Sequence, residues 1–102
     1  MYRARDPLEH EEWLAAIDDA AERLRLGGEA KSRASDLFLS TVPKTDRSKQ
    51  ATVAASIYAG ALIAGDRRSQ SAVAEAVGVS RLTVQQRWKN LLEEAGLEPP
   101  QW

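Results

Sequence analysis

Long polar side chains recur at helical spacing near the end of the chain, and their chemistry suits contact with a nucleic acid. Residues 80–95 combine an apolar face with a face of amide and basic groups. The polar face carries Arg81, Gln85, Gln86 and Lys89. Residues three or four apart share one side of a helix, so these groups are expected opposite Val84. Arginine and lysine can pair with phosphate oxygens, and glutamine can hydrogen bond to base edges in the major groove.

The residues around this face predict a helix-turn-helix over residues 69–95. Ala74 lies where two helices would cross, Gly78 can take the left-handed conformation of a tight turn, and Val84 would face back into a core. Ser80 can cap the second helix through its hydroxyl. The same spacing also occurs in packed helical hairpins with no nucleic-acid role. The pattern alone leaves both interpretations open.

Charge is distributed unevenly along the chain. The net charge of −1 at pH 7 argues mildly against a general nucleic-acid binder. Residues 66–92, however, carry five basic and two acidic side chains, whereas residues 1–34 carry six basic and eight acidic ones. The basic excess therefore gathers around the predicted helix-turn-helix.

The length and composition exclude several classes of site. A chain of 102 residues is suited to a single domain. It has no cysteine, and the lone His10 cannot build a zinc site, so we expect no metal and no cofactor. Adjacent carboxylates such as Asp18 and Asp19 point to different sides of a helix, and no glycine-rich phosphate loop follows a strand. We therefore do not expect an enzyme.

No segment predicts a membrane or an export function. The apolar run of residues 51–65 has no charge but is shorter than the ~20 residues that span a bilayer. The first residues lack the apolar core of a signal peptide, so a cytoplasmic location is expected.

Helical periodicity accounts for nearly the whole chain, and no strand pattern is found. The sequence thus predicts an all-α fold. The third helix is apolar or small on every side, so the others must surround it, and Gly60 would let a neighbour approach closely. The expected helices cover about residues 7–26, 29–41, 48–64, 69–77 and 80–95, with a polar loop at 43–47.

Two stretches carry a family resemblance. RSKQATVAASIYAGAL at residues 47–62 and SQSAVAEAVGVSRLTVQQRWKNLL at residues 69–92 resemble one cyclin-like repeat of transcription factor IIB and its archaeal counterpart, transcription factor B. The resemblance implies a five-helix cyclin-like domain over residues 1–102 that ends in a helix-turn-helix. It also implies a role in transcription initiation at archaeal promoters, where the helix-turn-helix reads an element beside the TATA box and the repeats contact TATA-binding protein and polymerase.

The resemblance assigns roles to single residues. Leu82 and Gln85 fall on base-reading positions of the recognition helix, and Arg87 falls on a commonly basic position. The family commonly has arginine where this chain has Gln85 and often asparagine where it has Gln86, so bidentate reading of guanine by arginine is unavailable. Gln85 or Gln86 can instead pair with adenine, and Leu82 can touch a thymine methyl group.

These observations together predict a small DNA-binding transcription regulator that places the helix of residues 80–95 in the major groove of double-stranded DNA. The expected base contacts are Leu82, Gln85 and Gln86, and the expected phosphate contacts are Arg67, Arg68, Arg81, Arg87 and Lys89. In the structural alternative, Arg67 and Arg68 are a solvated loop pair and Trp88 belongs to the core. Because one module buries little surface, a homodimer or another partner is expected as well.

The alternative function is a cyclin-fold interaction module without direct DNA contact. It would bind TATA-binding protein or another basal transcription factor, and the acidic first helix motivates this hypothesis. An acidic helix face is also explained by solubility alone. Retardation of duplex DNA separates the two functions.

Overall fold

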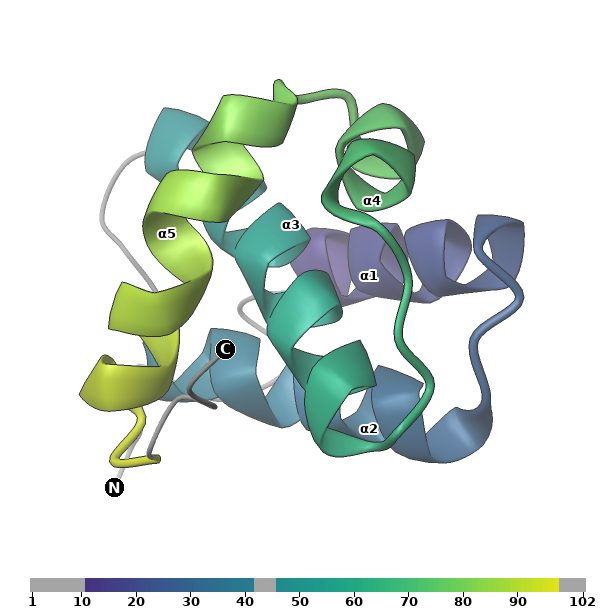
Figure 1. The fold of residues 1–102 in the computed structure, drawn as a ribbon, viewed down its shortest axis with the longest axis horizontal. Coiled ribbons are helices and arrows are strands. Elements are labelled where there is room, and N and C mark those ends of the chain that lie inside the picture. Colours follow the sequence, from purple (N-terminus) through teal and green to yellow (C-terminus); the bar gives the residue numbers. More distant parts are fainter. Residues whose placement is uncertain (1–10, 42–45, 98–102) are drawn as a thin grey trace.

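The described part of the chain folds into five helices. The computed structural model describes residues 11–41 and 46–97, except for the side chains of Asp46 and Arg47. No strand occurs in these residues, and the predicted all-α fold with five helices is confirmed (Figure 1). The helices are α1 (Glu11–Arg23), α2 (Gly28–Ser40), α3 (Asp46–Ile63), α4 (Gln70–Val77) and α5 (Arg81–Glu94).

Two predicted helix boundaries differ from the structure by two or more residues. The first helix ends at Arg23 rather than near residue 26, because Arg25 adopts a left-handed φ of 58° and the Leu26 N–H donates back to the Ala21 carbonyl at 2.9 Å. The third helix begins at Asp46 rather than near residue 48, so the last two residues of the predicted polar loop at 43–47 belong to α3. The predicted start of the first helix at Pro7, together with His10, lies outside the described residues.

Helix α3 is the centre of the fold, as its composition predicts. Every residue from Ala51 to Ala61 is buried, and α3 contacts each of the other four helices. Figure 1 shows α3 passing through the middle of the molecule, between α5 on one side and α1 on the other. Its small side chains allow this crowding, and Gly60 lies against the backbone of Ala30 and Ala34 in α2.

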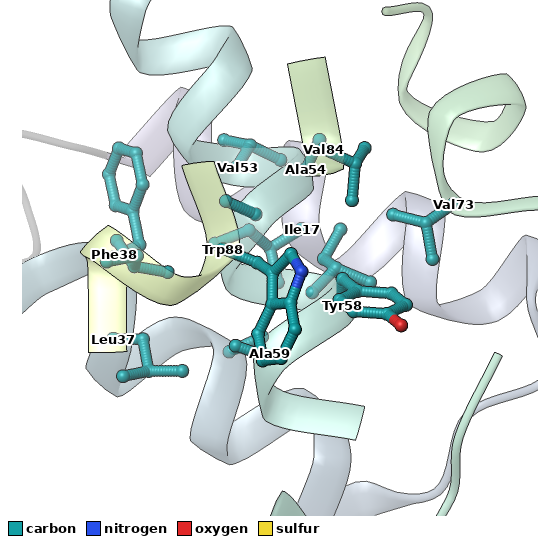
Figure 2. Packing of buried hydrophobic residues seen from close by; sticks show 14 of the residues in the cluster. Ile17, Leu37, Phe38, Val53, Ala54, Tyr58, Ala59, Val73, Val84 and Trp88 are labelled. Carbon is teal, nitrogen blue, oxygen red and sulfur yellow. The ribbon is translucent and has the colours of Figure 1, made fainter. Parts of the chain in front are cut away.

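The inner face of α5 closes the core over α3. Val84, Trp88 and Leu91 are buried there. Figure 2 shows the Trp88 and Tyr58 rings beside each other in an edge-to-face arrangement, with centroids 5.3 Å apart. Trp88 is thus a core residue, as the structural alternative predicted.

The connection between α3 and α4 holds the turn between α1 and α2. Arg68 Nε donates to the Leu24 carbonyl at 2.8 Å and Arg68 Nη2 donates to the Arg25 carbonyl at 2.9 Å, which satisfies acceptors at the end of α1. Asp66 Oδ2 accepts from the Gly27 N–H at 2.9 Å, and Asp66 Oδ1 accepts from Arg68 Nη1 at 2.8 Å. Two charged side chains therefore link loops about 40 residues apart in sequence.

We expect Asp66 to make the fold acid-sensitive. The hydrogen bond from the Gly27 N–H, and then that from Arg68, hold the pKa of the Asp66 carboxyl below its ordinary value. A group with a lowered pKa in the folded state stabilises the fold above its unfolded pKa, and this contribution is lost as pH falls through the folded pKa, below about pH 4. Urea unfolding at several pH values should show a smaller loss of stability in acid for Asp66→Asn than for the unaltered chain. If the free energy of unfolding falls equally with pH in the two proteins, Asp66 does not have this role.

Candidate nucleic-acid interface

The turn between α4 and α5 has the geometry that its sequence predicts. Gly78 adopts a left-handed conformation with φ 92° and ψ 34°. The N–H groups of Gly78 and Val79 both donate to the Ala74 carbonyl, at 2.8 and 3.0 Å, and so close the end of α4. Ala74 is buried between the helices and Val84 is fully buried, which confirms the roles predicted for both.

Side-chain caps fix the beginnings of α4 and α5. Ser69 Oγ accepts from the Ala72 N–H at 3.0 Å, and Ser80 Oγ accepts from the Thr83 N–H at 3.1 Å. Gln50 of α3 adds a contact that the sequence analysis missed, because its Nε2 donates to the Val77 carbonyl at 3.2 Å. Gln50 is a polar residue beside the apolar run of its helix, which was the one available signal. The turn is therefore stabilised by a side chain of α3 as well as by its own hydrogen bonds.

The outer face of α5 is exposed along its length in the described structure. Leu82 is 52% exposed although it is a large apolar residue. The predicted contact residues Gln85, Gln86, Arg87 and Lys89 are also exposed. These side chains all lie on the solvent-exposed part of α5, away from the buried Val84 and Trp88, and Arg87 lies on the side that also lines hollows against α3. Their contacts with bases and phosphates remain predictions.

Arg81 is the first residue of α5, and its side chain contacts both α4 and α5. Its Nη1 donates to Gln85 Oε1 at 2.8 Å and to Gln70 Oε1 at 3.3 Å. The first contact follows from the i,i+4 spacing within a helix, whereas the second joins α5 to the first residue of α4. The sequence predicts a phosphate contact for Arg81 and gives no local signal for the hydrogen bond to Gln70.

The structure places Arg67 and Arg68 in different surroundings. Arg67 is exposed before α4, whereas the Arg68 side chain is only 29% exposed and all three guanidinium nitrogens donate hydrogen bonds within the protein. Arg68 thus has a structural role at the α1–α2 turn, which the sequence alternatives did not include. The structure tests neither of the two predicted phosphate contacts.

A hollow of about 460 Å³ lies beside the start of α5. Its wall combines the beginning of α3, the Gly78 turn and the first turns of α5. Hydroxyl, amide and guanidinium groups line it, contributed by Ser48, Gln50, Ser80, Thr83, Gln86 and Arg87. The polar surface beside the predicted reading face therefore includes residues of α3 that the sequence analysis did not single out.

No group of three or more metal-ligating side chains occurs within residues 11–41 and 46–97. Over the same described residues, none of the helices has the length and apolar character needed to cross a membrane.

Comparison with known proteins identifies related sequences. Residues 11–94 match the family model described as "Transcription factor TFIIB repeat". Over 78 residues, or 74% of this chain, the sequence is 35% identical to transcription initiation factor IIB of Methanosphaerula palustris and covers 23% of that protein. It is 30% identical over 87 residues, or 82% of this chain, to transcription initiation factor IIB of Pyrococcus abyssi and covers 29% of that protein. The chain spans about a quarter of the length of these relatives.

Proposed function

Because the chain belongs to the transcription factor TFIIB repeat family, we propose that it is a small DNA-binding transcription regulator that places α5 in the major groove. One observation carries the proposal: α5 is locked to the core by Val84 and Trp88 while its opposite face remains exposed. A capped helix presented beyond a tight turn is the element by which helix-turn-helix proteins enter the groove.

The exposed groups divide by their chemistry. Gln85 and Gln86 can hydrogen bond to base edges, and Leu82 offers an apolar surface to a thymine methyl group. Arg87 and Lys89 carry positive charge on the same helix and would pair with phosphates, with Arg67 as a further cation before α4. We leave Arg68 out of the proposed contacts because its guanidinium holds the α1–α2 turn.

The proposed role has consequences for partners and location. A single module buries little DNA surface, so we expect specific binding to need a second copy or a basal transcription factor such as TATA-binding protein. The relatives are named as transcription initiation factors, not as enzymes. A regulator of this kind acts on chromosomal DNA, which agrees with the cytoplasmic location expected from the sequence.

Electrophoretic titration of a random-sequence duplex at low salt tests the proposal. We expect retardation at low salt that weakens as salt is added, to a dissociation constant on the order of 10⁻⁴ to 10⁻⁶ M at physiological salt. A chain that leaves the duplex unretarded throughout this range would overturn the proposal.

One observation favours a second candidate function, a protein–protein interaction module. A groove of about 520 Å³ lies between α1, α3 and α4, and both the apolar Trp13, Val53 and Val77 and the charged Asp19, Arg23 and Glu75 line it. This groove could bind a basal factor without DNA. Copurification with a basal factor by a chain that does not retard DNA would favour this function instead.

A further inference from the structure

The hydrogen bonds of Arg81 point to a base preference at the reading face, an inference that rests on the DNA-binding function proposed above. Arg81 is the first residue of α5 and Gln85 lies one turn later, with 2.8 Å between Arg81 Nη1 and Gln85 Oε1. The same Nη1 lies 3.3 Å from Oε1 of Gln70, the first residue of α4. The guanidinium is therefore held by acceptors from two helices.

This contact selects one orientation of the Gln85 amide. A guanidinium has only donors, so the amide atom that faces it must be the oxygen. Turning the amide over would bring its NH₂ group against the N–H of Arg81, with two donors facing each other. In the observed orientation the NH₂ group points away from Arg81, and Oε1 keeps a second lone pair for another donor.

An amide held in this way suits adenine better than guanine. In the major groove adenine presents the N7 acceptor beside the N6 donor, whereas guanine presents two acceptors, N7 and O6. Gln85 can donate from Nε2 to adenine N7 while the free lone pair of Oε1 accepts from N6. Against guanine, Oε1 would face the O6 acceptor. Turning the amide would only bring Oε1 against the N7 acceptor, so neither orientation gives two hydrogen bonds to guanine. Arg81 favours adenine by fixing beforehand the one orientation that pairs with it.

We propose that Arg81 is a positioning residue that holds the Gln85 amide for adenine, so that α5 prefers an A·T pair to a G·C pair where Gln85 meets the DNA. Arg81 then acts through Gln85 rather than as a phosphate contact. Leu82 lies beside Arg81 on α5 and is 52% exposed, so it can add contact with a neighbouring thymine methyl group.

Selection from duplexes with a randomised central segment, followed by paired measurements, tests the proposal. Two fluorescent duplexes of the selected sequence would differ only in the pair that Gln85 reads, A·T in one and G·C in the other. That pair is identified as the position whose preference disappears in Gln85→Ala. We expect the unaltered chain to bind the A·T duplex about tenfold more tightly, as for one bidentate base contact.

Variants separate positioning from a general loss of charge. Arg81→Ala should reduce the preference to less than about threefold, because the amide then loses the fixed orientation that pairs with adenine. Arg81→Lys should restore part of it, because lysine can still donate to Gln85 Oε1. The matched control is Arg87→Ala, which removes one exposed positive charge from the same helix and should weaken binding to both duplexes alike.

The outcomes distinguish this inference from the proposed function. Binding without a preference for A·T at the Gln85 position, or an unchanged preference in Arg81→Ala, would overturn the inference alone. A chain that binds neither duplex nor the random pool at low salt would overturn the DNA-binding function and the inference with it. Far-UV circular dichroism of each variant establishes that the comparison is between folded proteins.

Discussion

Replacing Gly60 with alanine should destabilise the protein by about 2–3 kcal/mol, although alanine is the better helix former. Within a helix, the intrinsic preference alone would favour Gly60→Ala by about 1 kcal/mol. In this structure a Cβ atom at residue 60 would lie 2.8 Å from the Ala34 nitrogen and 3.1 Å from the Ala30 carbonyl oxygen. Both are backbone atoms, so no side chain can rotate away and α2 must move off α3.

Urea unfolding followed by far-UV circular dichroism measures this effect. The matched control is Gly28→Ala at the start of α2, where nothing lies within 4 Å of the added Cβ atom. The control should be neutral or more stable by up to about 1 kcal/mol, because alanine restricts the unfolded chain. Gly60→Ala as stable as the unaltered protein would show that α2 and α3 tolerate a wider separation than the structure indicates.

Gly78 and Gly60 show which features of this fold a sequence can predict. Gly78 and Ser80 could be assigned their roles because each acts on its own backbone or on a residue three positions away. The sequence indicated that Gly60 allows a close approach, but which helix approaches depends on packing between distant segments. The assignment of α2 to that position therefore needed the structure.

The residues of the candidate site also fall into those whose position the sequence predicts and those whose partners only the structure shows. The exposed face of α5 follows from helical periodicity, so Gln85, Gln86 and Lys89 were correctly expected on the outside. The partners of the other polar residues lie far along the chain. Arg68 Nε bonds to a carbonyl 44 residues away and Gln50 to one 27 residues away. No local pattern distinguishes an arginine that fixes a turn from one that is free to meet a phosphate.

Reversing two charges on α5 should nearly abolish DNA binding if the proposed function is correct. Arg87→Glu combined with Lys89→Glu replaces two proposed phosphate contacts with repulsive charges. We expect affinity for a random duplex at low salt to fall on the order of 100-fold, and the slope of log K against log salt to decrease by about two. Lys89 Nζ lies 5.6 Å from the centroid of the Trp88 ring, and an exposed cation–π contact contributes about 0.5–1 kcal/mol, so the double variant should remain folded.

A second double charge-reversal variant tests whether DNA binding depends on the position of the charges or only on their number. Arg23→Glu with Arg33→Glu changes the net charge by the same amount on α1 and α2, where both arginines are exposed partners of surface ion pairs. Long-range repulsion should weaken DNA binding by less than about threefold in this variant and leave the salt slope unchanged. If both double variants lose affinity equally, net charge rather than the α5 face governs binding, and the groove-reading role of α5 is wrong. If only the α5 variant loses it, the phosphates are met by the same helix that exposes Gln85 and Leu82.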